Sequence, residues 1–346
     1  MDYVSLMKKL DIPEEFSARV TNFINSTDLS EYSDELRLIR LPESRNEAFA
    51  SLTAKLTDDA DGVKIFALEM LAAAEAYDEY RTRGISDEIY YDTMLAFRRQ
   101  LGESYTESRG WIFDRGSWDT HHISLQLFRI GELEYAFANK YGEDILAVHI
   151  PSDAKLSHES LDASFAEARE FFRKYYPEAG ERRITCGSWL LSAKLKNILN
   201  EDSKILLFQS KFHHERVLGG EGCLRWVFGV VGKQLSDIDV SALSEKTSLQ
   251  RAIKKLYLSG EALGEGYGIY KENDSAWNIK LGKYRHYKGG EYEVIAIGRN
   301  SETLEDTVIY RALYGDGGVW VRPAYMWCQR VTKDGTAVPR FQYIGD

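Results

Sequence analysis

Residues 144–191 constrain the fold of this chain more than any other stretch. Residues 145–150 form a nearly unbroken apolar run of strand length, which is typical of a strand buried on both faces. Pro151 ends the run, Ser157 is placed to cap a helix, and residues 184–191 are predicted to form the next strand. Two strands joined by a helix-length crossover usually lie parallel, so the N–H groups of the helix N-terminus would face an anion beyond the first strand.

Length and composition indicate a globular chain of about two domains, since it has 346 residues. It has no run of about 18 apolar residues, and its first residues lack the pattern of a secretory signal. Its three cysteines (Cys186, Cys223 and Cys328) are too few and too scattered for a disulfide framework or a zinc site. We therefore expect a cytoplasmic protein with reduced thiols and no membrane contact.

The charge of the chain is negative and unevenly spread. The formal net charge of −10 argues against broad binding to nucleic acid. Residues 277–346, however, contain 10 Lys and Arg against 8 Asp and Glu, a balance of +2. This C-terminal segment is therefore a compositional unit of its own.

The residues before this core stretch are predicted to be mainly helical. Residues 61–84 are rich in helix formers and end at a glycine, and residues 86–102 follow with Ser86 as the expected cap. Residues 111–124 show little helical period. Residues 123–151 are predicted to form two strands joined by a hairpin turn at residues 139–142.

Further elements are predicted after residue 191. They are a short helix capped by Ser192, a strand over residues 203–217 with Leu206, Phe208 and Phe212 in the core, and a last strand over residues 224–232. The glycine-rich residues 260–268 follow a helix rather than a strand, so they fail the context of a dinucleotide-binding loop. We interpret them as a helix exit and a linker.

Residues 277–346 are predicted to form a small all-β unit. Lys288-Gly289-Gly290, Asp316-Gly317-Gly318 and Lys333-Asp334-Gly335 are strong hairpin signals between short strands. Five or six strands in so short a segment imply a small closed or half-closed barrel.

Residues 112–231 resemble the core of the GNAT superfamily of N-acyltransferases in the order of their predicted elements: strand, strand, helix, strand, short helix, strand, strand. The segments LFRIGELEYAF, HIPSDAKLS, CGSWLL and KTSLQRAI also make residues 1–267 similar to bacterial acyltransferase-domain proteins. The resemblance implies an enzyme that uses acyl-coenzyme A as co-substrate.

The resemblance also implies where coenzyme A lies. Backbone groups of Val148 and Ile150 would pair with the pantetheine arm, and Ser152, Lys155 and Ser157 would lie at the pyrophosphate. The two glycines of the usual pyrophosphate loop are replaced here by residues with side chains. Losing two charge-assisted hydrogen bonds could weaken binding by about a hundredfold.

Acyl transfer to an amine needs a base for the amine and an acid for the leaving thiolate. His149, Glu134 and Glu132 are candidate bases, and Cys186 on the neighbouring strand is a further catalytic candidate. The alternatives are a solvated strand face for the glutamates and core packing for His149 and Cys186. The tyrosine that often serves as the acid in the superfamily has no counterpart in residues 192–208.

Two histidine pairs raise the question of a metal site. Neighbouring residues of a strand point to opposite faces, so His121-His122 and His213-His214 are not expected to chelate one ion. Residues 212–217 also lack the helical HExxH spacing. We predict no metal.

The C-terminal unit closely resembles a small bacterial domain of unknown function. The resemblance is carried by YRHYKG (residues 284–289), Glu302-Thr303, YRALYG (residues 310–315) and WVRP (residues 320–323), and it implies an SH3-like barrel. Five residues combine guanidinium groups with aromatic faces, which suits anions, stacked bases or peptides: Arg285, His286, Tyr287, Trp320 and Arg322. The alternative is that the aromatic residues fill a thin core.

The sequence thus predicts an α+β multidomain chain. A helical N-terminal subdomain would span residues 1–108, a GNAT-like mixed α/β core residues 109–272, and an SH3-like all-β barrel residues 277–346. The predicted function is N-acyl transfer from acyl-coenzyme A, such as acetyl-coenzyme A, to a small-molecule or peptide amine. The alternative is a catalytically degenerate scaffold whose barrel binds a protein or an anionic ligand. The acceptor, the acyl group and the oligomeric state are left open.

Overall fold

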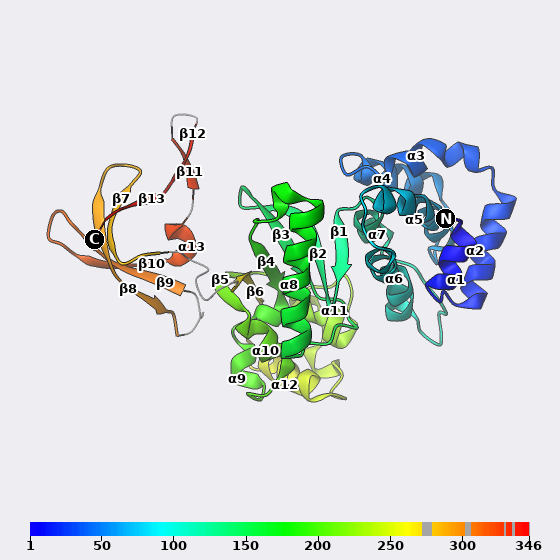
Figure 1. Cartoon of the computed structure of the whole chain (residues 1–346). Coiled ribbons are helices and arrows are strands. Elements are labelled where there is room, and N and C mark those ends of the chain that lie inside the picture. Colours follow the sequence, from blue (N-terminus) through cyan, green and yellow to red (C-terminus); the bar gives the residue numbers. More distant parts are fainter. Residues whose placement is uncertain (272–278, 302–305, 329, 334–335, 346) are drawn as a thin grey trace. The chain divides into compact units, whose positions relative to one another are not determined.

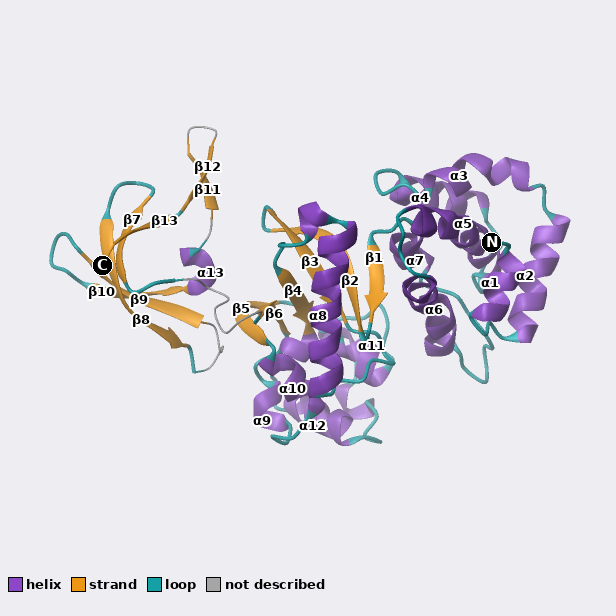
Figure 2. Ribbon diagram, in the orientation of Figure 1, coloured by secondary structure: helices purple, strands orange, loops and turns teal. Residues whose placement is uncertain are grey.

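The structure of the chain is a computed structural model that describes residues 1–271, 279–301, 306–328, 330–333 and 336–345. The Glu302-Thr303 pair and the Asp334-Gly335 turn lie outside the described residues. The chain divides into two compact units, Met1–Arg182 and Arg183–Asp346, and the division falls inside the predicted core domain. Figure 1 labels the elements, and Figure 2 distinguishes the helices from the strands.

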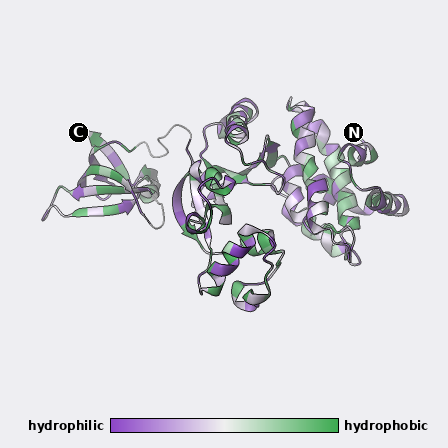
Figure 3. Cartoon of the chain, turned by 90° about the horizontal axis from the view of Figure 1, so that it is seen from below, coloured by the Kyte–Doolittle hydropathy of each residue, from purple (hydrophilic) through white to green (hydrophobic). Residues whose placement is uncertain are grey.

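The first unit begins with helices, as predicted. They are α1 (Tyr3–Lys9), α2 (Glu14–Ser26), η1 (Leu29–Tyr32), α3 (Ser33–Leu38), α4 (Arg45–Lys55), α5 (Val63–Thr82), α6 (Asp87–Ser104) and α7 (Gly116–Ile123). Helix α5 contacts α1, α2, α3, α6 and α7, so it is the centre of this subdomain. Ser86 caps α6 by accepting the N–H of Ile89 at 3.3 Å. Figure 3 shows hydrophobic and hydrophilic residues interspersed along these helices, as expected where one side of each faces a core.

Three antiparallel strands follow in the first unit: β1 (Leu127–Ile130), β2 (Leu133–Lys140) and β3 (Glu143–His149). The predicted hairpin between β2 and β3 is confirmed. Its turn residues Tyr141 and Gly142 both have positive φ, 55° and 80°, as a two-residue turn matched to the strand twist requires. A second hairpin at Gly131 splits the first predicted strand into β1 and β2.

Helices pack on both faces of these strands. Helix α8 (His158–Tyr175) carries Phe165 and Phe172, whose rings lie 6.2 and 6.4 Å from that of Tyr135 on β2. Glu134, the preceding residue, points the other way and pairs with Arg99 of α6. Because successive strand residues alternate between faces, α8 covers one face and the N-terminal helices the other.

The second unit begins with a mixture of short helices and strands. These are β4 (Ile184–Ser188), η3 (Trp189–Leu191), α9 (Leu195–Ile198), α10 (Lys204–Ser210), β5 (Phe212–Leu218), α11 (Cys223–Phe228), η4 (Leu235–Asp237), η5 (Val240–Ala242), α12 (Ser248–Leu258) and β6 (Glu265–Tyr270). The single strand predicted over residues 203–217 is wrong, since its first half is α10. The last strand predicted over residues 224–232 is also wrong, since most of it is α11. Both errors arise because periodicity does not separate a short apolar strand from a short buried helix.

The glycine-rich segment 260–268 begins as the predicted helix exit after α12, but its residues from Glu265 onward form strand β6 and not the predicted linker. Strand β6 lies between β4 and β5 and pairs antiparallel with both. A Cβ on Gly266 would come within 2.2 Å of the Leu191 carbonyl oxygen, and one on Gly268 within 2.9 Å of the His213 carbonyl oxygen. These glycines are therefore required for close backbone approach in the strand.

The C-terminal domain is an all-antiparallel, barrel-like sheet, as predicted. Strands β7 (Gly282–His286), β8 (Glu291–Arg299), β9 (Asp306–Ala312), β10 (Val319–Pro323) and β13 (Phe341–Gly345) pair in the order β10-β9-β8-β7-β13, and β11 (Arg330–Lys333) pairs with β12 (Thr336–Pro339). The turns predicted at residues 288–290 and 316–318 join β7 to β8 and β9 to β10. Trp327 of α13 (Ala324–Trp327) stacks on Phe341 with ring centroids 3.8 Å apart and fills the core. None of the helices in the described ranges is long and apolar enough to cross a bilayer.

Candidate active site

Two of the predicted catalytic residues, Glu134 and His149, are direct partners across β2 and β3. Directly paired residues of antiparallel strands share a face, with Cβ atoms about 4.5–5.5 Å apart. This face lies under α6 and α7, whereas Val148 shares the α8 face with its partner Tyr135. Both candidates therefore lie between the strands and the N-terminal helices.

Glu134 is a buried carboxylate and not a solvated strand residue. Its exposed fraction is 3%, it forms an ion pair with Arg99 of α6, and its Oε1 lies 3.8 Å from His122 Nε2. Burial alone would raise its pKa, but the charges of His122 and Arg99 outweigh burial and lower the pKa to about 2. Glu134 is therefore ionised at neutral pH. The solvated alternative is wrong for this residue because helices cover the face.

His122 links Glu134 to a second buried carboxylate. Its Nδ1 lies 3.0 Å from Asp119 Oδ1, and both side chains are fully buried on α7. Burial favours the neutral ring, but the two carboxylates outweigh it and raise the pKa of His122 to about 9. Asp119 Oδ1 also accepts the side-chain N–H of Gln100 at 2.8 Å. The result is a buried row of alternating charges: Asp119, His122, Glu134 and Arg99.

His149 is the neutral member of the cluster. Burial lowers its pKa, although the charge of Glu134 opposes part of that shift. Its imidazole ring meets the Trp118 ring edge-to-face, with centroids 4.7 Å apart. The imidazole nitrogens form no hydrogen bond with any other residue that the structure describes. A neutral imidazole beside an ionised carboxylate can accept a proton and keep the resulting cation stabilised.

Sequence reasoning missed Arg99, Asp119 and His122. The sequence predicts little helical period for the segment with His121 and His122 and places the two residues on a strand, but the segment forms α7. On a helix, residues three apart lie on one face, so the spacing of Asp119 and His122 is the signal that could have found the pair. Within the described ranges, no group of three or more metal-ligating side chains is present.

The loop after β3 is held by carboxylates of the protein itself. The backbone N–H of Lys155 donates to Glu132 Oε2 at 2.7 Å, and Ser152 donates its hydroxyl proton to Glu103. Ser157 caps α8 by accepting the Ser160 N–H at 3.2 Å. Among the predicted cofactor residues, Val148 is buried on β3 and Ile150 follows the strand, whereas the side chains of Ser152, Lys155 and Ser157 are exposed.

The loop also carries an acid that would face a bound anion. Asp153 accepts from Arg129 Nη1 at 2.9 Å and lies 3.8 Å from Arg99 Nη1. Carboxylate oxygens of Glu132 and Asp153 thus already accept hydrogen bonds from donors that a pyrophosphate could use.

Cys186 on β4 is buried in the second unit, 1% exposed. Burial, together with the charge of Glu265, raises the pKa of its thiol. A neutral buried thiol fits core packing, the alternative to catalysis.

The five barrel candidates divide between the two faces of their sheet. His286, Trp320 and Arg322 lie on the face that also carries the core residues Tyr310 and Phe341, as the strand register shows. Arg285 points to the opposite face and forms an ion pair with Glu291 at 2.8 Å. Tyr287 follows the end of β7, with its ring 4.5 Å from that of His286.

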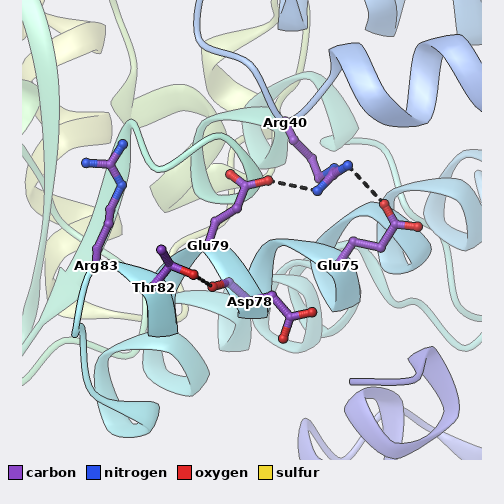
Figure 4. A pocket seen from close by; sticks show the side chains of 6 residues that line it. All are labelled: Arg40, Glu75, Asp78, Glu79, Thr82 and Arg83. Carbon is purple, nitrogen blue, oxygen red and sulfur yellow. Dashed lines mark hydrogen bonds and ion pairs between the residues drawn. The ribbon is translucent and has the colours of Figure 1, made fainter.

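A surface hollow of about 610 Å³ lies along α5 and is shown in Figure 4. Arg40 crosses it to Glu75 and Glu79 at 3.1 and 2.8 Å, and Arg83 lies over the Tyr176 ring. Its cations are already engaged, and none of the candidate catalytic or cofactor residues lines it.

Three described families of protein domains match the chain. Residues 1–125 match the N-acyltransferase N-terminal domain, and residues 127–270 match the GNAT-like C-terminal domain. Residues 282–343 match a protein of unknown function, DUF1653. The chain is thus a GNAT-like acyltransferase-domain protein fused to a DUF1653 domain. No curated protein matches it.

Solved acyltransferases share the fold of the first two domains. An acyltransferase mutant in complex with octanoyl-CoA is 21% identical, over 77% of this chain and 86% of that chain, with a TM-score of 0.60. An acyltransferase in complex with decanoyl-CoA and teicoplanin is 21% identical, over 79% of this chain and 100% of that chain, with a TM-score of 0.55. At this identity the likeness shows a common fold.

Proposed function

We propose that this protein transfers an acyl group from acyl-coenzyme A to an amine, with His149 as the general base and Glu134 as the carboxylate that stabilises its protonated form. The pairing of these two residues across β2 and β3 is the observation that carries the proposal. The acyltransferase fold and the domain families support the same reaction class.

The residues of the cluster account for the proton transfers. Neutral His149 takes a proton from the acceptor amine while the amine nitrogen attacks the thioester carbonyl carbon. The new C–N bond forms, the C–S bond breaks, and the coenzyme A thiolate receives a proton from the imidazolium. Glu134 is already ionised, so it lowers the energy of that imidazolium without changing its own charge.

Coenzyme A would lie along β3, with its pyrophosphate at residues 152–157. Lys155 supplies a positive charge there, and the N-terminus of α8 adds about 0.3–1 kcal/mol for an anion. The solved neighbours contain octanoyl-CoA and decanoyl-CoA, which makes medium-chain thioesters the natural probes alongside acetyl-CoA.

Calorimetric titration of the full chain with coenzyme A, acetyl-CoA and decanoyl-CoA tests the site. Micromolar binding is expected, and Lys155→Glu should weaken it by at least about tenfold. Lys174→Glu is the matched control, because Lys174 is an exposed lysine in the last turn of α8, away from the loop that carries Lys155. No heat up to millimolar ligand would contradict the transferase proposal.

The second candidate function is the degenerate scaffold. The observation that favours it is the Glu132 carboxylate on the Lys155 N–H, where an anion would otherwise bind. Failure to bind any of the three ligands would support this alternative.

A further inference from the structure

The barrel sheet carries a cluster of cations and aromatic rings on its core-facing side. The guanidinium of Arg322 lies 5.7 Å from the Phe341 ring centroid, and the ring of His286 lies 4.7 Å from the same ring. Phe341 lies on β13, and these side chains reach it from the neighbouring strand β7 and from β10 at the other edge of the sheet.

Further positive charge surrounds His286. Lys288 lies over the Tyr287 ring at 5.7 Å, and its backbone N–H approaches His286 Nδ1 at 3.4 Å. The backbone oxygen of Arg340 accepts the Tyr287 N–H at 2.9 Å, which places Arg340 beside the same turn. Burial and the charges of Arg340, Arg322 and Lys288 all lower the pKa of His286, as expected for an imidazole in a positively charged environment.

No ion pair within the described ranges offsets the charge of Arg322 or Lys288. Arg322 Nε is also buried and has no hydrogen-bond partner among the described residues. The acid Glu291 faces the other side of the sheet with Arg285. Asp316 lies at the Trp320 end of the cluster, since its Oδ1 and Trp320 Nε1 would both contact a Cβ on Gly318.

Exposed rings border the cluster. Trp320 lies two residues before Arg322 on the same face of β10, and its exposed fraction is 59%. Tyr314 is 55% exposed and its hydroxyl lies 2.5 Å from that of Tyr292, whose ring contacts that of Phe341 at 5.6 Å. A cationic centre beside solvent-exposed aromatic rings suits a phosphate attached to a planar group.

We propose that the barrel is a binding site for a small phosphate monoester, with the phosphate on Arg322, Lys288 and Arg340 and the attached ring system against Trp320. The site is separate from the acyl-coenzyme A site proposed above. It gives the C-terminal domain a ligand-binding role of its own.

Titration calorimetry of the full chain with AMP and with inorganic phosphate, at low ionic strength, tests the proposal. AMP is expected to bind more tightly than phosphate, because only AMP has a ring to place on Trp320. Arg322→Gln should weaken both ligands by about tenfold or more, as expected for loss of a charge-assisted, bidentate contact. Trp320→Ala should weaken AMP alone.

Arg285→Gln is the matched control, since it removes an arginine from the same sheet but from its other face. It should change the affinity by less than about twofold. Arg322→Lys keeps the charge and should retain part of the affinity, which separates binding from a folding defect.

Three results would overturn the site. The first is no heat with either ligand up to about 10 mM. The second is an equal loss in the Arg285 and Arg322 variants. The third is AMP binding that Lys155→Glu abolishes and Arg322→Gln leaves intact, because that would place AMP at the acyl-coenzyme A site.

Discussion

Glu134 on β2 and His149 on β3 are direct partners in an antiparallel ladder, and both point under α6 and α7. The carboxylate is ionised and the imidazole is neutral. In the mechanism proposed above, this pairing gives the base a counter-charge for its protonated form before the reaction starts.

The first prediction concerns the titration of His149. Burial should hold its pKa below the ordinary value of about 6.5. Glu134→Gln should lower the pKa further, because the imidazolium then loses its counter-charge. NMR titration of labelled histidine, with His149→Gln to assign the signal, measures both values. A pKa at or above 6.5 that does not respond to the Glu134 substitution would refute the assignment.

The second prediction concerns turnover. His149→Gln should reduce acyl transfer by about 10²–10⁴-fold, the usual contribution of a general base, while coenzyme A affinity stays unchanged. Glu170→Gln, at an exposed position in the C-terminal half of α8, is the control and should retain full activity. Release of free coenzyme A in the presence of primary amines measures the rate. An unchanged rate in the His149 variant would remove it from the mechanism.

The third prediction concerns stability. Glu134→Gln leaves Arg99 and His122 buried beside a neutral group and should lower the free energy of unfolding by about 3–5 kcal/mol at pH 7. The folded-state pKa of Glu134, about 2, lies below its unfolded value, so its stabilisation is complete above about pH 5 and is lost as the pH falls toward 2. Urea unfolding at several pH values checks this. Exposed Glu159→Gln should have little effect at any of them.

The fourth prediction concerns Glu69 on α5. Neither of its side-chain oxygens has a hydrogen-bond partner in the described structure, and its exposed fraction is 0%. Burial and the charge of Asp119 raise its pKa well above the ordinary value. The unfolded state therefore ionises first as the pH rises above about 4.3, and the fold loses up to about 1.4 kcal/mol per pH unit.

Glu69→Gln removes that titration. The variant should gain stability relative to the natural protein as the pH rises from 4 to 8, with the difference smallest at pH 4. Thermal or urea unfolding across this range measures the difference. A stability difference that does not vary with pH would show that Glu69 is ionised in the folded protein.

The fifth prediction concerns the loop after β3. Glu132→Gln should tighten coenzyme A binding by about tenfold, because a carboxylate no longer competes for the Lys155 N–H. Glu143→Gln, at the start of β3, is the control. Titration calorimetry distinguishes the two variants. Equal affinity in the Glu132 variant and the natural protein would place the pyrophosphate away from this N–H.

The sequence alone determined the features that depend on local chemistry. The apolar run before Pro151, the Ser157 cap and the apolar face of α8 predicted a strand and a helix that the structure confirms. The turn at residues 139–142 and the glycine turns of the C-terminal domain were likewise predicted, because positive φ favours a few residue types. The domain resemblances rested on such local motifs.

Only the tertiary structure decided which residues form the candidate site. Arg99 comes from α6, and Asp119 and His122 come from α7, and only the packing of these helices on β2 brings their charges to Glu134. From the sequence, Gly266 and Gly268 indicate a linker. In the structure they lie in β6, which pairs with β4 on one side and β5 on the other and leaves no room for a Cβ at either position. Packing between segments distant in the sequence determines which side chains are buried. Burial in turn determines the charge state of a side chain and where only a glycine fits, so the local sequence cannot predict these two properties.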